Sequence, residues 1–395
     1  MAKPGVLYIS YDGMLEPLGQ SQVLAYLERL TGDARIHLVS YEKPADRADA
    51  AKVAAMHERL KSAGIGWHPL TYHKTPTVPA TLYDIALGMV LALWLAARHR
   101  LGIVHARSYI PALIGWVVKL LTGAKLLFDM RGLWADERTD GGIWPVGGRI
   151  YRAVKRLERI LLGGADHIVT LTHASRAVIA AFPDRIDAPI SVIPTCADLD
   201  RFTPGTSGKV EPFTLGYLGS IGTWYLFGEV LACFKLIRAK RPDARLLVVN
   251  RNEQDLVRRM VAEAGIPDLA LELTSADHAD VPAQVRRMSV GAAIIKPVFS
   301  KIASAPTKLA EYLGCGVPCL GNVGVGDMEA ILEGERTGVA LHDFSDADRA
   351  AAVERLLDLV EDLSTPARCR SVALNLFSVE HGANDYRAIW RSLAA

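Results

Sequence analysis

Short apolar segments alternate with longer segments of helical periodicity along almost the whole chain. The apolar segments are uniformly hydrophobic, which is typical of strands in parallel sheets that helices cover on both faces. In the first half they lie at 5–10, 35–41, 102–108, 125–130 and 167–172. The intervening pattern predicts helices near 21–30, 45–63, 82–98, 110–121 and 149–162. This half therefore predicts a doubly wound α/β domain.

A second series of the same kind begins at residue 213. Its expected strands are 213–220, 244–250, 269–274, 290–297 and 317–322, and its expected helices lie near 226–240, 253–264, 281–288, 306–314 and 346–362. A polar stretch rich in Pro, Gly and Ser follows an apolar segment at 190–194 and has the composition of a linker. We therefore expect two Rossmann-like domains, 1–204 and 205–376. Because ligands bind beyond the carboxyl ends of strands in such sheets, we expect a cleft between the domains.

Charge is distributed unevenly, although the net charge of the 395 residues is only +2. The first half is basic, and its excess gathers at 149–162, where five cations alternate with apolar residues at helical spacing. These cations are Arg149, Arg152, Lys155, Arg156 and Arg159. An ordinary surface helix and a contact with an anionic membrane surface both fit this pattern. Nucleic acid fits it less well, because no run of stacking aromatic residues accompanies the cations.

Two features bear on the compartment. The apolar run 85–97 has thirteen residues, fewer than the roughly 20 that span a bilayer, so we expect no transmembrane helix. The five cysteines are odd in number and scattered, and no secretory signal pattern opens the chain. A reducing cytoplasm is the expected location. Cys315 and Cys319 have no second cysteine pair, so we expect no metal site.

The segment KIASAPTKLAEYLGCGVPCLGN predicts an anion site at the start of a helix. Pro306 suits a first helical turn, and Ser304 is close enough to cap it. The N–H groups of Thr307 and Lys308 then point at any ligand beside a hydroxyl and an ammonium. Glu311, one turn further on, can accept hydrogen bonds from a vicinal diol such as a ribose. The alternative is a structural helix with a surface lysine.

This segment resembles the nucleotide-sugar signature of retaining family-4 glycosyltransferases of GT-B architecture. Glu311 and the segment GCGVPCL match the second glutamate and the helix end of that signature, whereas Ala303 stands in place of the first glutamate. The segments VLYISYDGMLEPLGQ, SVIPTCADLDRF and GYLGSIGTWY resemble other conserved strands and loops of the family. FSVEHGANDYRAIW resembles a final helix, here 377–395, that crosses back onto the first domain.

The resemblance implies three groups of site residues. The residues expected to bind the donor are Gly19, Gln20, Gly219, Ser220, Gly222, Thr307, Lys308 and Glu311. Those expected at the reacting centre are Arg131, Asp129 and His105, with Arg131 at the position where the family commonly has a histidine. Arg107, Asp136 and Glu137 are expected to bind the acceptor. A packed role for His105 and a solvated loop for Asp136 and Glu137 are the alternatives.

The implied activity is transfer of a sugar from a UDP- or GDP-linked donor to an acceptor hydroxyl, with retention at the anomeric carbon. The first domain would hold a sugar or lipid-linked acceptor, and the second would hold the nucleotide. Neither a metal nor another cofactor is required, because the leaving diphosphate can take the acceptor proton. Assembly of bacterial cell-surface polysaccharide or glycolipid is the expected setting. A nucleotide-sugar epimerase and a non-catalytic nucleotide-sugar-binding protein are the alternatives.

Overall fold

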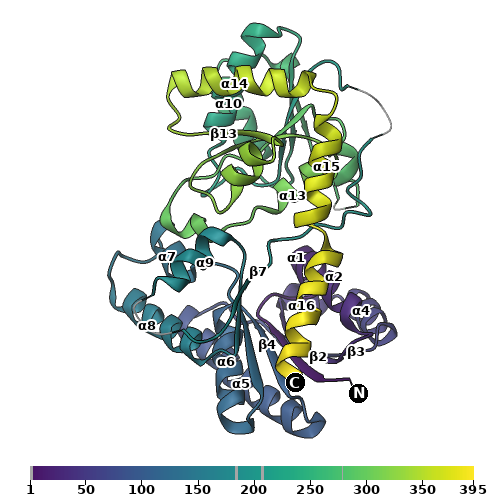
Figure 1. Cartoon of the computed structure of the whole chain (residues 1–395), viewed down its shortest axis with the longest axis vertical. Coiled ribbons are helices and arrows are strands. Elements are labelled where there is room, and N and C mark those ends of the chain that lie inside the picture. Colours follow the sequence, from purple (N-terminus) through teal and green to yellow (C-terminus); the bar gives the residue numbers. More distant parts are fainter. Residues whose placement is uncertain (1–2, 183–185, 206–208, 278) are drawn as a thin grey trace. The chain divides into compact units, whose positions relative to one another are not determined.

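The computed structural model describes residues 3–182, 186–205, 209–277 and 279–395 (Figure 1). The chain forms two compact units: unit 1 comprises Met1–Pro194 and Val379–Ala395, and unit 2 comprises Thr195–Ser378. The first boundary lies ten residues before the expected one at 204, because Leu199 and Phe202 pack into the core of unit 2. The expected cleft between the units stays a prediction.

The sheet of unit 1 has seven parallel strands in the order β3-β2-β1-β4-β5-β6-β7. They are β1 (Gly5–Ser10), β2 (Arg35–Glu42), β3 (Ile65–Thr71), β4 (Ile103–Arg107), β5 (Lys125–Asp129), β6 (His167–Thr170) and β7 (Ile190–Val192). In register, Ser10 lies beside Arg107, and Arg107 lies beside Asp129. The strand order reverses between β1 and β4, so the carboxyl ends of these strands mark the place where ligands bind in such folds.

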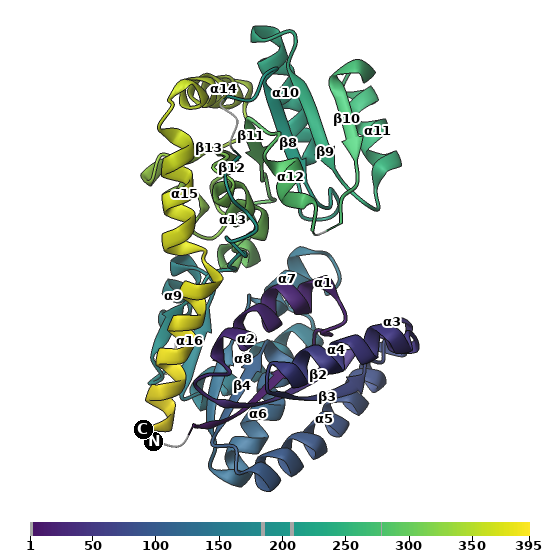
Figure 2. The ribbon, with the colours of Figure 1, turned by 90° about the vertical axis from the view of Figure 1, so that its right-hand side faces the viewer.

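Helices cover both faces of this sheet. They are α1 (Pro17–Gly19), continued by a π-helical turn at Gln20–Leu24, α2 (Ala25–Leu30), α3 (Pro44–Ala48), α4 (Ala50–Ser62), α5 (Thr77–His99), α6 (Tyr109–Thr122), α7 (Trp134–Asp140), α8 (Arg149–Gly164), α9 (His173–Ala180) and α16 (Val379–Ala394). Figure 2 shows the C-terminal helix α16 beside α2, and it also contacts β4. The last helix of the chain therefore completes the first unit, as expected.

Three elements of unit 1 were absent from the sequence-based expectation. β3 contains Gly66 and Pro69, which disfavour strands, yet it pairs with β2 along its whole length. The short helices α7 and α9 follow strand ends where loops were expected. Tertiary pairing and packing override local propensity in these segments.

Helix α5 is longer than the apolar run that predicted it. With 23 residues it is, by length and composition alone, apolar enough to cross a membrane. One side of it packs against β1, β2 and α6. Its buried Asp84 accepts hydrogen bonds from the Tyr11 hydroxyl (2.9 Å) and the His73 N–H (3.0 Å). These contacts fix α5 to unit 1 along one side and leave its other side to solvent.

The sheet of unit 2 has six parallel strands in the order β10-β9-β8-β11-β12-β13. They are β8 (Thr214–Leu218), β9 (Arg245–Val249), β10 (Leu271–Thr274), β11 (Val290–Ala292), β12 (Cys319–Asn322) and β13 (Gly338–Leu341). The helices are α10 (Phe227–Lys240), α11 (Gln254–Glu263), α12 (Val281–Val285), α13 (Thr307–Gly314), α14 (Asp346–Glu361) and α15 (Thr365–Leu376). β13 and α15 were not expected. The strand order reverses between β8 and β11.

Unit 2 has one hydrophobic core on each face of its sheet. Side chains of α12, α13 and α15 pack on one face, around Tyr312 and Leu313. Those of α10, α11 and α14 pack on the other, around Phe227 and Phe234. Together with the sheet of unit 1, this architecture confirms the predicted α/β class with two doubly wound sheets.

Candidate functional site

The loop after β8 forms a glycine turn at the reversal point of unit 2. Gly219 has a φ of +93°, a backbone conformation that residues other than glycine rarely adopt. The Gly222 N–H donates to the Ser220 hydroxyl at 3.3 Å. A Cβ atom at Gly222 would lie 2.9 Å from a carboxylate oxygen of Glu253. The three residues expected to bind the donor here thus lie in one tight turn whose shape depends on its two glycines.

Two residues that the sequence did not suggest hold this turn. The side-chain amide of Asn250 donates to the Gly219 carbonyl at 2.9 Å and to Glu253 at 3.0 Å. The Glu253 carboxylate also accepts the Ile221 N–H at 2.9 Å. Burial opposes ionisation of Glu253, but these hydrogen bonds hold its pKa below the ordinary value. Both residues follow β9, so a polar pair directly after a neighbouring strand was the signal that could have identified them.

Helix α13 begins at Thr307, with Pro306 as its N-cap residue. No side chain caps this end, so Ser304 is not the cap that the sequence predicted. Pro306 takes an extended conformation (φ −67°, ψ 123°) and its carbonyl accepts the Leu309 N–H at 3.0 Å. The helix therefore starts one residue later than expected. Thr307 is half-buried, and its N–H remains available at the helix start.

Lys308 is buried, with 7% of its surface exposed, and is not a surface lysine. Its Nζ atom has no hydrogen-bond partner among the residues that the structure describes. It lies 3.8 Å from the ring centre of Tyr225 and 4.4 Å from that of Tyr217. Burial lowers the pKa of Lys308 to about 7, although Glu311 opposes the shift. An ammonium without a hydrogen-bond acceptor indicates an anionic ligand at this position.

Glu311 lies on the same side of α13 and is 8% exposed. Burial raises the pKa of Glu311 to about 7, against the opposing effects of Lys308 and Arg201. Its carboxylate accepts no hydrogen bond from any described residue. A second cation, Lys301, lies over the ring of Trp224 at 3.8 Å. This part of unit 2 is therefore suited to a ligand that has both a negative charge and hydroxyl groups.

In unit 1, a cluster of charged groups lies at the carboxyl ends of β4 and β5. Asp129 is fully buried at the end of β5. Its carboxylate accepts the Tyr386 hydroxyl at 3.1 Å and lies 3.7 Å from Arg107 Nη1 and 3.8 Å from Arg131 Nη1. Burial alone would raise the pKa of Asp129, but the neighbouring guanidinium groups hold it below its ordinary value. From this buried place, Asp129 positions the two arginines.

His105 is a packed histidine at the centre of the same cluster. Its Nδ1 atom accepts the indole N–H of Trp390 at 3.3 Å. This hydrogen bond places the proton on Nε2, which lies 3.8 Å from an Asp129 oxygen. Burial lowers the pKa of His105, so the ring is neutral near pH 7. Tyr386 and Trp390 both come from α16, so the C-terminal helix supplies two contacts to this cluster.

Arg107 and Arg131 line a cavity of about 650 Å³ in unit 1. Arg107 lies at the end of β4, and its Nε atom is 3.4 Å from Asp12. Arg131 follows β5 with a φ of +58°, an unusual conformation for a residue with a side chain. Aromatic side chains form much of the wall, including Tyr72, Trp134 and Trp144. The two arginines are thus the predicted site residues of this unit that face open space.

Asp136 and Glu137 lie on α7 and not on a solvated loop. The Asp136 carboxylate is buried and accepts hydrogen bonds from the Tyr151 hydroxyl and the Lys155 ammonium, both at 2.9 Å. It joins α7 to α8 and has no free side toward the cavity. Glu137 is half-buried, and neither carboxylate lines the cavity. The structure therefore does not bring these two residues together with Arg107.

Gly19 and Gln20 belong to the segment after β1. A Cβ atom at Gly19 would lie 2.0 Å from the Gly13 carbonyl oxygen, so only glycine allows this close approach. The side-chain oxygen of Gln20 accepts a long hydrogen bond from Arg59 at 3.4 Å. The buried Glu42 accepts the N–H groups of Met14 (2.8 Å) and Leu15 (3.0 Å) and so fixes the loop before α1. Glu42 lies at the end of β2 and was not identified from the sequence.

Residues 20–201 match the sequence model of Glycosyltransferase Family 4. The match covers most of unit 1. Unit 1 therefore contains a Glycosyltransferase Family 4 domain. This agrees with the family that the Glu311 segment indicated.

Related proteins span nearly the whole length of this chain. A D-inositol 3-phosphate glycosyltransferase of Gordonia bronchialis is 22% identical over 90% of this chain and 80% of its own. Sucrose-phosphate synthase from Thermosynechococcus elongatus superposes with a TM-score of 0.74 and 15% identity, over 99% of both chains. Anabaena HepE, in complex with UDP and glucose, superposes with a TM-score of 0.67 and 13% identity, over 98% of this chain and all of its own. The chain therefore has the GT-B fold.

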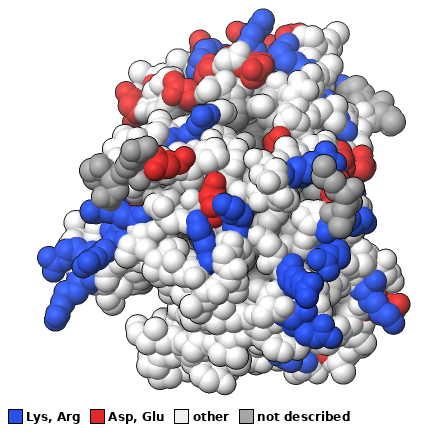
Figure 3. Space-filling view, turned by 60° about the horizontal axis from the view of Figure 1, so that its bottom comes forward, with Lys and Arg blue, Asp and Glu red and all other residues white. Residues whose placement is uncertain are grey.

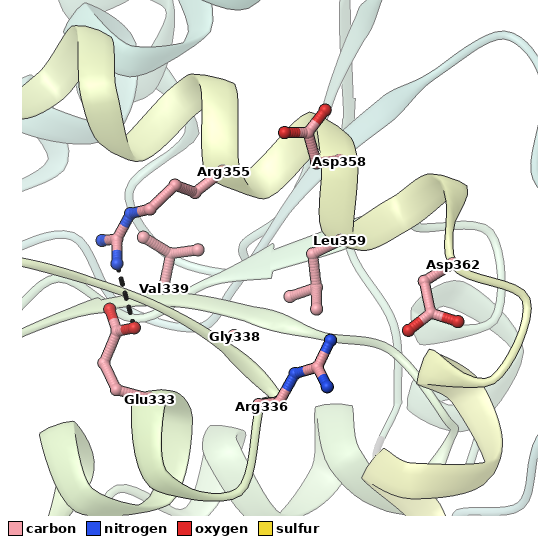
Figure 4. Close-up of a pocket in the computed structure, with 8 residues that line it drawn as sticks. All are labelled: Glu333, Arg336, Gly338, Val339, Arg355, Asp358, Leu359 and Asp362. Atoms are coloured by element: carbon pink, nitrogen blue, oxygen red, sulfur yellow. Dashed lines mark hydrogen bonds and ion pairs between the residues drawn. The ribbon is translucent and has the colours of Figure 1, made fainter.

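The protein has a further pocket, of about 330 Å³, at the opposite end of the strands of unit 2 (Figure 4). Gly338, the first residue of β13, lines it, so the pocket lies at the amino ends of the strands. Arg355 and Glu333 on its wall form an ion pair at 3.0 Å. This pocket is separate from the glycine turn and from Lys308. Among the described residues, no group of three or more His, Cys, Asp or Glu could hold a metal ion.

Proposed function

We propose that the protein transfers a sugar from a nucleoside-diphosphate donor to an acceptor hydroxyl, with retention of the anomeric configuration. The observation that supports this most strongly is the buried ammonium of Lys308, which has no hydrogen-bond partner among the described residues. A donor diphosphate supplies the acceptor oxygens that this ammonium requires. Glu311 on the next turn then accepts hydrogen bonds from the ribose hydroxyls.

The backbone near the two residues supports the same ligand. The N–H groups at the start of α13 and the positive end of its dipole favour a phosphate beside Thr307. Gly219 and Gly222 let the turn after β8 approach the diphosphate without a side chain in between. The Anabaena neighbour binds UDP, which supports UDP-linked sugars as the first donors to test, with GDP-linked sugars next.

A front-side transfer fits the charged cluster of unit 1. Asp129 is enclosed by Arg107, Arg131 and Tyr386, so it is not free to form a covalent bond to a sugar. In a front-side reaction the leaving diphosphate oxygen takes the acceptor proton, and the new glycosidic bond forms on the face that the leaving group occupied. The ammonium of Lys308 stabilises the charge that develops on that oxygen. No metal is needed in this scheme.

A coupled assay tests the proposal. The purified protein is incubated with UDP- and GDP-linked sugars, first chosen by the thermal stabilisation that each confers. Release of nucleoside diphosphate that depends on added acceptor supports transfer. Isomerisation of the donor sugar would establish an epimerase instead. Donor binding without either reaction would establish a non-catalytic nucleotide-sugar-binding protein.

We also propose that the enzyme works at the cytoplasmic face of an anionic membrane, in cell-surface polysaccharide or glycolipid assembly. Helix α8 exposes four arginines at helical spacing, namely Arg149, Arg152, Arg156 and Arg159. Lys155, the fifth cation of this helix, is instead paired with Asp136 and Glu158. Each exposed cation near such a surface contributes about 1 kcal/mol, and salt screens the attraction. Sedimentation with anionic and with neutral vesicles, at low and high salt, tests this placement.

A further inference from the structure

The cavity of unit 1 has two chemically different ends. Its polar end lies at the carboxyl ends of β1 and β4, where Asp12, Arg107 and Arg131 face it. The remainder is lined mainly by aliphatic and aromatic side chains from α5, α6 and the segment between α7 and α8. A volume of about 650 Å³ is large enough for a ligand of substantial size. A ligand that fits both ends must itself be polar at one end and apolar along the rest.

The apolar walls include aliphatic side chains that are more than half exposed. They are Val78 (60%), Leu82 (61%), Ile143 (61%) and Ile150 (52%). Transfer of aliphatic groups out of water is favourable, and the stabilisation is proportional to the area that is covered. A sugar acceptor has hydroxyl groups and requires hydrogen-bonding partners in place of these side chains. The walls therefore favour an alkyl or isoprenoid chain over a free sugar.

The apolar surface continues outside the cavity along α5. Tyr83, Leu87, Val90 and Trp94 are exposed on this helix beyond Leu82. Asp84, the one charged residue between positions 78 and 97, is buried on the opposite side. The lower part of Figure 3, which looks onto the end where α5 and α6 lie in Figure 1, shows a broad white area with Lys and Arg at its sides. Such a surface is suited to the boundary between headgroups and acyl chains.

The charges at the cavity identify the polar end of the ligand. Lys43 pairs with Glu16, and Arg107 and Arg131 share Asp12 and Asp129. Arg138, also on the wall, forms no ion pair with any residue of the described part of the chain. The three carboxylates just named balance the charges of the other three cations, so the positive charge of Arg138 is not balanced. The polar end of the cavity therefore favours an anionic group such as a phosphate.

We propose that this cavity binds the acceptor of the transfer reaction, and that the acceptor is an amphiphile with an anionic head and a hydrophobic chain. The head lies toward Arg131 and Arg138, and the chain lies over Leu82 and Ile143 toward the outer face of α5. This inference rests on the proposed function, because it takes the ligand of unit 1 to be the acceptor. A soluble sugar does not belong to this class of acceptor, because it has no hydrophobic chain.

The test is a binding measurement that involves no donor. Titration calorimetry with dodecyl phosphate, below its critical micelle concentration, is compared with inorganic phosphate and with dodecyl maltoside. We expect dodecyl phosphate to bind at least about tenfold more tightly than either, because only it satisfies both ends of the cavity. Equal binding of inorganic phosphate would overturn the role of the chain. Equal binding of dodecyl maltoside would overturn the role of the anion.

Two pairs of variants locate the binding site. Leu82→Ser with Ile143→Ser should weaken dodecyl phosphate about tenfold or more, whereas Leu120→Ser with Leu121→Ser should not. Leu120 and Leu121 are matched controls because they are equally exposed, at 61% and 68%, but lie on α6 outside the cavity. All four side chains are exposed, so these variants are expected to fold. Equal effects of the two pairs would overturn the assignment to the cavity.

A third comparison separates the charge at the cavity from general positive charge. Arg138→Ala should weaken dodecyl phosphate and leave dodecyl maltoside unchanged. Arg35→Ala is the control, because Arg35 is exposed at the start of β2, at the amino ends of the strands and away from the cavity. Failure of these binding tests in a protein that still transfers sugar to a soluble acceptor would overturn the amphiphile and leave the proposed function standing.

Discussion

Binding of a diphosphate donor should take up a proton at Lys308. Burial lowers the pKa of this residue from 10.5 to about 7 in the ligand-free protein. Since one pKa unit corresponds to 1.36 kcal/mol, keeping the ammonium charged there costs about 5 kcal/mol relative to water. A bound diphosphate favours the charged form and raises this pKa again. Above pH 7 the free protein has lost the proton that the complex holds, so affinity should fall as the pH rises.

The expected slope follows from linkage. Between pH 7 and the pKa of Lys308 in the complex, the dissociation constant should rise up to tenfold per pH unit, and below pH 7 Lys308 should contribute no slope. Glu311 complicates the wild type, because burial raises its pKa to about 7 as well. Ionisation of Glu311 adds a negative charge beside the ligand and a better acceptor for the ribose. The variant Glu311→Gln removes this second titration and isolates Lys308.

Calorimetry in buffers of different ionisation enthalpy measures both the affinity for the ligand and the number of protons taken up on binding. A UDP-sugar is the suitable ligand, because each of its phosphates keeps one charge over this pH range. Glu311→Gln should take up nearly one proton on binding at pH 8 and much less at pH 6. The double variant Lys308→Ala with Glu311→Gln should take up none. Its affinity at pH 7 should be lower than that of Glu311→Gln by about 1.5–3 kcal/mol, which is roughly 10- to 150-fold. Proton uptake that is the same in both variants would refute the role of Lys308.

Three further predictions concern individual side chains. Glu311→Gln should raise the dissociation constant for the donor, and the difference from wild type should vanish for a 2′,3′-dideoxy nucleotide; an equal difference with that analogue would show that Glu311 does not bind the ribose. Lys308→Met should stabilise the ligand-free protein below pH 7, because it removes a buried charge without a hydrogen-bond acceptor; urea unfolding at pH 6 measures this, and a loss of stability would contradict it. Glu42→Gln should destabilise unit 1 by about 1–3 kcal/mol, because an amide places an N–H group against the Met14 or Leu15 N–H. Unchanged unfolding of this last variant would mean that the loop before α1 does not depend on the carboxylate.

The local sequence was sufficient to predict the start of helix α13 but not the contacts that surround it. The order Pro306, Thr307, Lys308 and Glu311 predicted a helix start with an anion site, and α13 begins within one residue of that expectation. The burial of Lys308 between two tyrosines was not predictable, because Tyr217 lies in β8 and Tyr225 in the loop after it. Contacts of this kind arise from the sheet topology, which brings distant segments to one edge.

The same reason explains the errors in unit 1. Asp136 was expected to bind the acceptor or to lie in a solvated loop, yet it lies on α7 and its partners Tyr151 and Lys155 come from the next helix. Glu42 supports a loop that lies 28 residues earlier in the chain. Strand order and domain class depend on a pattern repeated many times, so single exceptions such as Pro69 in β3 do not obscure them. The hydrogen-bond partner of an individual side chain depends on a single contact, and a periodic sequence pattern does not predict such a contact.

The position of α16 has a consequence for synthesis. Tyr386 and Trp390 reach Asp129 and His105 from the last helix of the chain. The ribosome must therefore translate all of unit 2 before the charged cluster of unit 1 can be completed. A product that stops before Val379 would lack both contacts even if the rest of unit 1 were intact. Completion of this cluster is therefore coupled to synthesis of the chain through Trp390.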